Sequence, residues 1–376
     1  MAGALTVKEA ESVGAVAPAE ARPRALEVVL AAVAALCGLG LVMAVSVQGP
    51  ERGVLLAIKA QGGKLAVATI GFLAFALVPL RLLRRFATPA FLVCVALCLI
   101  AALFGREVNN ARRWLPWGGQ PVEFARFALI VFCAAAVQRA GPEIVTFRRG
   151  MLPLLGAGTL LAGVLALQPD MGNAFLALLT SAAIALVAGV RLRWFAVLGV
   201  PALVAFAFAA LQLDYVRNRL AGFFAGTPSF QVQQSLHALG SGGLFGKGIG
   251  AGTMKLGHVP EAGNDFVFAI VGEELGLLGC ALTLAAYAAI AVCGLRLLGR
   301  AADPFARYLV FGFTFAICFQ AAMNLCVVTG VIPPKGIDLP FVSSGGTNLL
   351  FCMSAIGVLG NAARTRAAPS PVGRRG

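Results

Sequence analysis

Charged side chains are scarce in this sequence. Asp, Glu, Lys and Arg make up only 12% of the 376 residues and there are two histidines, whereas 59% are hydrophobic and the mean hydropathy is +0.88. Soluble globular proteins carry about 25% charged residues, so this composition excludes an ordinary soluble domain. Several apolar runs approach or exceed the roughly twenty residues that a helix needs to cross a bilayer. The sequence therefore predicts an all-α polytopic membrane protein.

Paired cysteine spacing is also absent. The nine cysteines all lie in apolar runs, with no CxxC and no pair in a polar loop. This pattern excludes a disulfide framework and a cysteine metal site, and it predicts small core residues.

A complete phosphate-binding loop is missing as well. In GSGGLFGKGIG, Ser241 stands where the first Walker glycine belongs, and Gly248 replaces the Ser or Thr that should follow the lysine. We therefore expect no nucleotide cofactor, and nothing in the sequence indicates a nucleic-acid partner.

What the sequence has in abundance is apolar spans. An even number of spans places both chain ends on one side, and the arginine-rich short turns put that side in the cytoplasm. No cleavable signal is evident, since the first apolar run starts near Ala25 behind a polar segment. We expect one ten-helix membrane domain, residues 25–363, between short cytoplasmic tails, 1–24 and 364–376. The predicted spans are 25–47, 65–83, 87–104, 122–140, 150–167, 173–190, 193–211, 266–294, 307–331 and 345–363.

One long extracytoplasmic loop, residues 212–265, interrupts this pattern. It contains two amphipathic pieces, DYVRNRLAGFF and FQVQQSLHAL, and then a glycine-dense run. Long loops in compact proteins are functional or disordered. The amphipathic pieces favour a folded loop, in which glycines permit close backbone approach.

Polar side chains gather on the predicted outer face, although charge near a bilayer is costly and marks function. Some of these residues could have a structural role instead of a functional one: binding of lipid headgroups, an intrahelical pair at spacing i, i+3, or helix capping. Caps and anchors should occur equally on both faces, so convergence on one face indicates a site. The residues are Arg112, Arg113, Trp114, Glu123, Arg126, Asp170, Glu261, Asp265 and Lys335.

Asp265 ends the long loop and directly precedes the apolar run FVFAIV. A carboxylate at a water–lipid boundary is hydrated enough to ionise, and the apolar surroundings nearby favour its acceptance of a proton, so it can act as a general base. Glu273 and Glu274 follow eight and nine residues later, about 12–13 Å deeper if the helix is straight. Hydrogen bonds that lock neighbouring helices are their favoured role, and a relay or lining of a path is the alternative.

Five blocks in order resemble the SEDS family (shape, elongation, division and sporulation), typified by FtsW, RodA and SpoVE. They are RRW before QPVEFAR, QPDMG, QVQQSLHALGSGGLFGKGIG, PEAGNDFVFAIVGEELG and VVTGVIPPKGIDLPFVSSGGTNLL. The motifs VGEELG and PPKG are more similar to those of the FtsW-like division branch than to those of the elongation branch. The resemblance implies a peptidoglycan glycosyltransferase of the bacterial cytoplasmic membrane that polymerises lipid II, a disaccharide-pentapeptide on undecaprenyl diphosphate, with inversion.

The resemblance also implies residue roles. Asp265 matches the family's essential aspartate and is the expected catalytic base. Arg112, Arg113, Trp114, Glu123, Arg126, Lys335 and Glu261 are expected to bind the substrate or its diphosphate. A divalent cation, Mg²⁺ or Mn²⁺, is a possible cofactor, with Glu123, Asp170 and Glu261 as its candidate ligands.

The sequence departs from the family pattern at three places. The family's His-Thr before the aspartate is Gly263-Asn264 here, its lysine after QPSELA is Arg126, and its SYGG is Ser343-Ser344-Gly345-Gly346. Arg for Lys keeps the charge but changes the geometry. The lost histidine removes an orienting partner of Asp265.

The resemblance implies partners too: a class B penicillin-binding protein transpeptidase and other divisome or elongasome membrane proteins. Two other classes of function stay open, a lipid II flippase and a non-catalytic scaffold. A RodA-like elongation role is the alternative within the enzyme class.

Overall fold

The computed structural model describes residues 22–364, apart from 109–110, 227–228, 300 and 302. Eight of its helices are long and apolar enough to cross a membrane, and two apolar segments are shorter, Met171–Val187 and Leu192–Phe208. Together they reproduce the ten predicted spans, so the predicted architecture of about ten helices is confirmed. Most of the predicted tail residues lie outside the described range, although α2 already begins at Arg22.

The first half of the chain supplies helices α2 to α7 and a small hairpin. Its elements are α2 (Arg22–Arg52), α3 (Val54–Leu77), α4 (Leu80–Phe104), β1 (Arg106–Val108), β2 (Ala111–Trp114), α5 (Val122–Ala140), η2 (Gly141–Val145), η3 (Phe147–Met151), α6 (Leu152–Leu167) and α7 (Met171–Val187). The antiparallel pair β1–β2 is the only sheet among the described residues. It was not predicted.

The second half begins with the seventh span, which is built from three consecutive pieces. Its elements are α8 (Leu192–Trp194), η4 (Phe195–Gly199), α9 (Val200–Leu211), α10 (Asp214–Phe224), α11 (Phe230–Ser241), α12 (Val267–Leu298), α13 (Pro304–Val328) and α14 (Gly346–Arg364). Helices α10 and α11 are the two amphipathic pieces predicted in the long loop.

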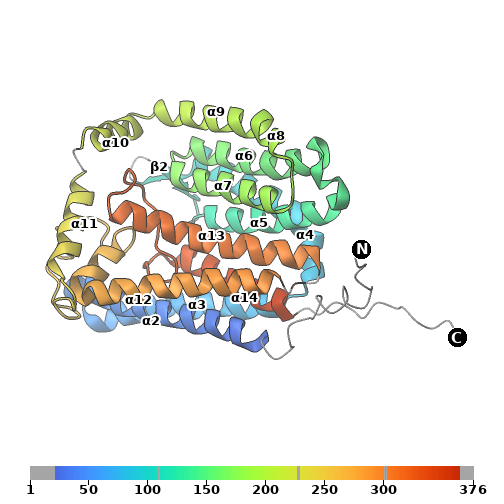
Figure 1. The fold of residues 1–376 in the computed structure, drawn as a ribbon. Helices are drawn as coiled ribbons and strands as arrows, with labels where there is room; N and C mark the ends of the chain where they lie inside the picture. The colour runs from blue at the N-terminus through green and yellow to red at the C-terminus, as the bar shows by residue number, and fades with distance from the viewer. Residues whose placement is uncertain (1–21, 109–110, 227–228, 300, 302, 365–376) are drawn as a thin grey trace, which may run out of the picture.

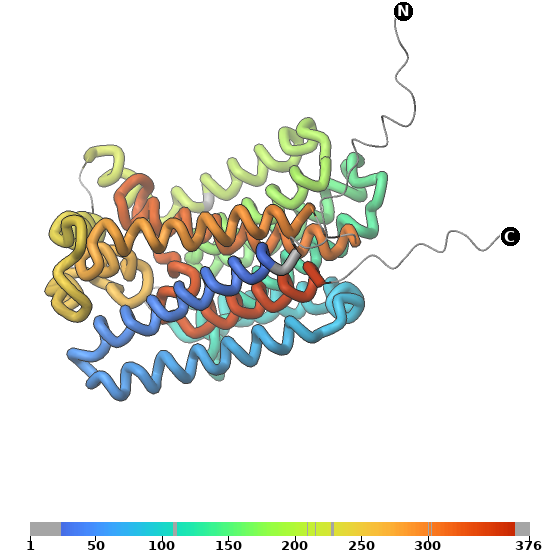
Figure 2. Tube along the Cα trace, turned by 60° about the horizontal axis from the view of Figure 1, so that its bottom comes forward, coloured from blue at the N-terminus to red at the C-terminus, as the bar shows by residue number. Residues whose placement is uncertain are grey.

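All these spans are helical because a backbone in lipid must satisfy its hydrogen bonds internally. The described chain starts and ends at one end of the bundle, whereas α10 and α11 lie at the opposite end (Figure 1). This arrangement agrees with an even number of spans. Helices α2, α3 and α14 lie side by side (Figure 2), and α3 contacts both of the others.

Helix α5 lies at the centre of the bundle. It contacts α4, α6, α7, α13 and α14, and its buried residues surround the helix. A helix that is apolar on all sides is an interior helix. Since α5 starts at Val122, its first turn carries Glu123 and Arg126 into the interior at one end of the bundle.

One predicted boundary and one predicted depth were wrong. Helix α3 begins at Val54, eleven residues before the predicted span. Two of its polar side chains face protein: Gln61 is buried, and Lys64 donates to the Ser344 carbonyl at 2.7 Å. Helix α12 is not straight. It breaks at Gly276, with φ 66° and ψ −163°, so the length of its first part cannot be read as depth along the membrane-crossing part.

Helices α3 and α14 pack through small residues. A Cβ on Gly357 would collide with the Phe72 carbonyl oxygen, and a Cβ on Gly71 would lie 2.5 Å from Leu350 Cδ1. Lipid supplies no hydrophobic force between helices, so close backbone approach provides the contact.

Gly357→Ala should therefore destabilise the protein by about 1–3 kcal/mol, the typical range for overpacking. Gly62→Ala is the matched control, since nothing lies within 4 Å of its added Cβ. Thermal unfolding in detergent measures both. Equal unfolding temperatures for the two variants would contradict this account of the contact.

Candidate active site

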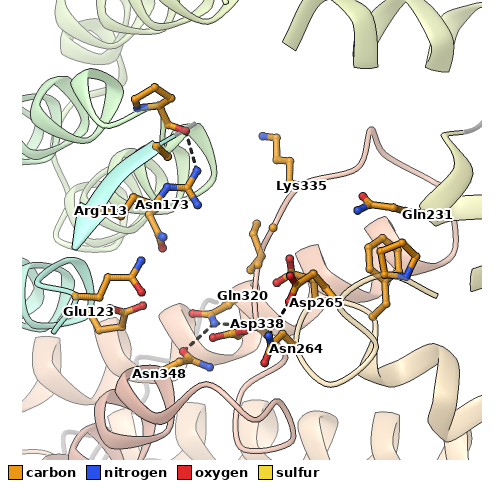
Figure 3. A pocket seen from close by; sticks show the side chains of 18 of the residues that line it. Arg113, Glu123, Asn173, Gln231, Asn264, Asp265, Gln320, Lys335, Asp338 and Asn348 are labelled. Atoms are coloured by element: carbon orange, nitrogen blue, oxygen red, sulfur yellow. Dashed lines mark hydrogen bonds between the residues drawn. The ribbon is translucent and has the colours of Figure 1, made fainter. Parts of the chain in front are cut away.

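A polar cavity of about 590 Å³ lies at the end of the bundle that carries α10 and α11, and Arg219 and Gln231 of these helices line it. Figure 3 shows side chains that come from many elements and point into it. Six residues named from the sequence line it: Arg113, Glu123, Arg126, Glu261, Asp265 and Lys335. The sequence pattern thus identified one real cavity, although the chemical role of each residue stays a prediction.

Two carboxylates lie on two separate loops of this cavity. Asp265 precedes α12, and Asp338 lies in the connection from α13 to α14. Asn324 of α13 joins the loops, since its amide donates to the Asp265 carbonyl at 2.6 Å and to the Ile337 carbonyl at 2.7 Å. The Asn324 side chain therefore holds the backbone at Asp265 and at Ile337, directly before Asp338.

These two carboxylates hold their protons more tightly than free acids. Burial, then the charge of Asp338 and that of Glu261, raise the pKa of Asp265 well above its usual value, whereas Arg113 opposes the rise. Burial and Glu261 raise the pKa of Asp338 to about 6. A carboxylate with a raised pKa and access to a cavity is a candidate general base.

Cationic side chains line one side of the cavity. Arg113, at the end of β2, donates to the Pro169 carbonyl at 2.9 Å, and its Nε lies 3.7 Å from Asp170 Oδ2. Lys335 lies over the ring of Phe175, with Nζ 4.7 Å from the centroid, and burial lowers its pKa. Positive charge placed here suits an anionic ligand.

The floor of the cavity is a network of amides around a buried guanidinium. Arg126 donates to Asn173 Oδ1 at 3.2 Å and to Gln320 Oε1 at 2.9 Å. Gln320 in turn donates to the Asp338 carbonyl and to Asn348. Beside them, the buried Glu123 Oε2 has no hydrogen-bond partner among the described residues, so it is available to a ligand.

Three other residues named from the sequence do not line this cavity. Arg112 is half exposed and its Nε lies 3.5 Å from Glu107 Oε2 across the β1–β2 hairpin. Trp114 is 40% exposed. Asp170 caps α7 through the backbone N–H of Asn173 and holds Arg113, which places it behind the cavity wall.

Glu273 and Glu274 are fully buried, and both bind the glycine-rich loop rather than the cavity. Glu274 Oε1 accepts from Lys255 Nζ and from Ser46 Oγ of α2, both at 2.6 Å. Glu273 Oε1 accepts from Lys247 Nζ at 2.8 Å and from the Thr253 N–H at 3.0 Å. The two glutamates join the loop to α12 and α2.

The break in α12 explains why this loop is rich in glycine. Backbone groups freed around Gly276 pair with the loop: the Leu277 N–H donates to the Gly243 carbonyl at 2.9 Å, and the Lys247 N–H donates to the Glu273 carbonyl at 3.0 Å. A Cβ on Gly246, which has φ 78°, would collide with the Glu274 carbonyl. Only glycine allows this approach and this backbone conformation.

An apolar cavity of about 420 Å³ adjoins the cationic side of the polar one. Both are lined by Arg113, Pro169, Arg219, Lys335 and Gly336. Beyond these shared residues, the cavity is lined by Asp170, Gly172 and apolar residues of α7, α9, α10, α13 and the 332–334 segment: Met171, Phe175, Phe206, Ala210, Val216, Leu220, Met323, Ile332, Pro333 and Pro334. The arrangement suits a molecule with an anionic head and an apolar tail.

The carboxylates named as metal ligands do not gather. Within the described ranges, no three His, Cys, Asp or Glu side chains are close enough to hold a metal ion. Mg²⁺ is commonly held by one or two carboxylates together with substrate phosphates. Besides Asp265 and Glu123, the polar cavity is lined by two carboxylates, those of Glu261 and Asp338.

Sequence reasoning missed several residues of the cavity. Asp338 lies three residues after Lys335 in the same glycine- and proline-containing segment, and its charge was a usable signal. The amides Gln320 and Asn348, which line the cavity, interrupt apolar helices, where polar side chains are energetically costly. Such polar residues could have been predicted to line a cavity, but the sequence does not show that they line the same one.

Residues 27–368 match the family model FTSW_RODA_SPOVE, described as a cell cycle protein. The probable peptidoglycan glycosyltransferase FtsW of Geobacter sulfurreducens is 33% identical over 319 residues, which cover 82% of this chain and 86% of the relative. Stage V sporulation protein E of Bacillus subtilis is 34% identical over 291 residues, covering 75% and 80%.

Solved structures share the fold. A chain of a peptidoglycan synthase complex that coordinates polymerization and crosslinking superposes with a TM-score of 0.73, at 24% identity, over 89% of this chain and 96% of that one. The rod shape determining protein RodA of Thermus thermophilus gives a TM-score of 0.67, at 24% identity, over 90% and 97%.

Lys255→Met should destabilise the protein by about 3–5 kcal/mol, because it leaves the buried Glu274 carboxylate without its cation. Adding Glu274→Gln should restore part of the loss, since both charges are then removed. Lys59→Met, at an exposed lysine of α3, is the control. Thermal unfolding in detergent measures all four proteins, and a double variant no more stable than Lys255→Met would argue against the pair.

Proposed function

Since the chain belongs to the FtsW, RodA and SpoVE family of cell cycle proteins, we propose that it polymerises lipid II into glycan strands at the outer face of the cytoplasmic membrane. The observation that carries the proposal is the polar cavity, in which two proton-holding carboxylates face a cationic side that continues into an apolar cavity. A division role is proposed over elongation, because the curated relatives include several named FtsW.

The substrate fits this cavity by its chemistry. A lipid-linked sugar has a polyprenyl tail, an anionic diphosphate and a hydroxyl-rich head. We assign the tail to the apolar cavity, the diphosphate to Arg113 and Lys335 at the junction, and the sugars to the amides and carboxylates of the polar cavity. Arg112 is left out of the diphosphate site, since it does not line the cavity.

In the proposed reaction, Asp265 takes the proton from the acceptor sugar hydroxyl as its oxygen bonds to the anomeric carbon of the donor. The bond from that carbon to the diphosphate oxygen breaks, and undecaprenyl diphosphate leaves. One in-line displacement inverts the anomeric centre. Arg113 and Lys335 stabilise the negative charge that develops on the leaving diphosphate.

A divalent cation would add charge stabilisation at the same diphosphate. The residues available to it are Asp338 and Glu261, together with substrate oxygens. Asp170 is already occupied by Arg113 and the start of α7. Glu123 lies among the floor amides.

The partner proposed for this chain is a single-pass class B penicillin-binding protein transpeptidase. The proposal is supported by its fold similarity to a chain of a complex that coordinates polymerization and crosslinking. A flippase would need an inner polar gate. Glu273 and Glu274 were the sequence basis for one, and they bind the outer loop instead.

Asp265→Asn should lower polymerisation by at least about 100-fold, the range for loss of a general base. The assay uses purified protein with a class B transpeptidase, labelled lipid II and Mg²⁺, with glycan polymer scored on a gel. Asp214→Asn is the matched control, because it removes an exposed aspartate of α10. If a folded Asp265→Asn protein makes polymer at the wild-type rate, Asp265 is not the general base.

If neither protein makes polymer although both are folded and bound to the partner, the enzyme proposal fails. Transfer of lipid II across liposomes that survives Asp265→Asn would then favour a flippase. A complex with the transpeptidase but without either activity would favour a scaffold.

The polymerisation rate should rise with pH over the range in which Asp265 loses its proton, because Asp265 accepts a proton only when it is ionised. This rising part of the pH–rate profile is its acid limb. Asp338 raises the pKa of Asp265, so Asp338→Asn should lower that pKa and move the limb to lower pH. The position of the limb is read from initial rates between pH 4 and 9. An unmoved or upward-moved limb would contradict the coupling of the two carboxylates.

A further inference from the structure

The end of the bundle opposite the polar cavity carries arginines that the proposed reaction does not use. Two connections meet there, residues 141–151 and 188–199, and each contributes two exposed arginines. Helix α8, in the second connection, lies at that end, away from α10 and α11 (Figure 1). We call the four residues the arginine cluster: Arg148, Arg149, Arg191 and Arg193.

Trp194 joins the two connections. Its Nε1 donates to the Val145 carbonyl at 3.0 Å, and its ring centroid lies 5.2 Å from that of Phe147. The guanidinium of Arg193 lies over the same ring, with Cζ 4.5 Å from the centroid. Since Arg148 directly follows Phe147, arginines of both connections extend from residues at or beside this aromatic contact.

The connection 141–151 is folded tightly on itself. A Cβ on Gly150 would collide with the Ile144 carbonyl oxygen. Thr146 Oγ donates to the Glu143 carbonyl at 2.8 Å and accepts from the Arg149 N–H at 3.3 Å. A backbone that is already fixed loses little conformational entropy when a ligand binds to its side chains.

The positive charge of the arginine cluster exceeds what its own carboxylate neutralises. Arg149 Nη1 lies 2.9 Å from Glu143 Oε1, so this arginine has a partner. Within the part of the chain that the structure describes, no carboxylate forms an ion pair with Arg148, Arg191 or Arg193. Three cationic side chains therefore remain to complement an anionic ligand.

Exposed apolar side chains border the arginine cluster. Leu192, which lies between Arg191 and Arg193 in the sequence, is 71% exposed, and Leu152 of α6 and Val197 of η4 are exposed as well. Acyl chains cover such side chains where the helices that carry them enter the bilayer. The arginines thus lie where the headgroup of a lipid that covers these residues would be.

We propose that the arginine cluster binds the headgroup of an anionic phospholipid, in the membrane leaflet opposite the polar cavity. The lipid phosphate accepts hydrogen bonds from Arg148 and from Arg193, one from each connection, and its acyl chains cover Leu192. One lipid thereby bridges the start of α6 and the start of the seventh span. This site lies outside the proposed reaction and does not depend on it.

Arginines also gather at one end of a membrane protein for orientation alone. Arginines of that kind attract anionic lipid through their general field, so one exposed arginine should act much like another. Arg81 provides the comparison, because it is exposed at the start of α4, at the same end of the bundle but in a different connection. A defined site distinguishes Arg148 and Arg193 from Arg81.

Native mass spectrometry of the full chain in detergent tests the proposal, with dioleoyl phosphatidylglycerol as the anionic lipid and dioleoyl phosphatidylcholine as the zwitterionic one. The wild type should bind one phosphatidylglycerol more tightly than phosphatidylcholine. Arg148→Gln with Arg193→Gln should weaken phosphatidylglycerol binding by about 25-fold, because each arginine contributes about fivefold. Arg81→Gln should stay within about twofold of the wild type. Thermal unfolding in phosphatidylcholine confirms that each variant is folded.

Trp194→Leu separates a built site from bulk charge. It removes the ring under Arg193 but no charge, and it should weaken phosphatidylglycerol binding by about two- to fivefold, the range for an exposed cation–π contact. A folded Trp194→Leu protein with wild-type affinity would overturn the proposed geometry.

Three further outcomes would overturn the lipid site: equal affinity of the wild type for the two lipids, equal losses in Arg81→Gln and in the double variant, or displacement of the bound lipid by millimolar inorganic phosphate. The last result would indicate a site for the free anion. None of these readouts uses polymerisation, so a failure of the proposed glycosyltransferase would leave them interpretable.

Discussion

The buried ion pair between Lys255 and Glu274 is the contact on which the half of the structure that carries the polar cavity depends. Lys255 is on the long loop, Glu274 is at the break of α12, and Ser46 of α2 binds both. A buried charge is tolerated only when it is paired and hydrogen-bonded. The pair therefore ties three segments to one geometry, and the backbone bonds around Gly276 follow from it.

That geometry places the candidate base. The short helical segment from Val267 to Leu275 has Asp265 just before its start and the two glutamates near its end. The glutamates are tied to the loop, while Asn324 and Ser343 hold the backbone at the other end. A carboxylate surrounded by other carboxylates would move away from them if its backbone were free. Because both ends are held, burial and then this repulsion raise the pKa of Asp265.

The four carboxylates that crowd the entry to α12 therefore divide into two pairs with opposite surroundings. Glu273 and Glu274 each meet a lysine from the loop. Glu261 and Asp265 meet each other and Asp338 across a cavity with Arg113 and Lys335 on its wall. Glu273 and Glu274 stabilise the fold, whereas no lysine neutralises the charge of Glu261 and Asp265 in the same way. An unbalanced negative cluster next to cations is a place where a charged substrate can bind and a proton can move.

Periodicity and composition were sufficient for the spans, because hydropathy depends on single residues and their order. They also identified six of the residues that line the cavity, since charge on one face of a membrane protein is conspicuous. They missed the break of α12, which needs the loop to pair with it, and the early start of α3, where Lys64 donates to the Ser344 carbonyl.

The sequence by itself determined an all-helical membrane protein with an acidic and basic cluster at one end. Only the tertiary structure decided which carboxylates are paired with lysines and which face the cavity. It also decided that Asn264 and Ser344, 80 residues apart, touch. Hydropathy is a local property, whereas the proton affinity of a carboxylate is set by the charges that folding brings within a few ångströms of it.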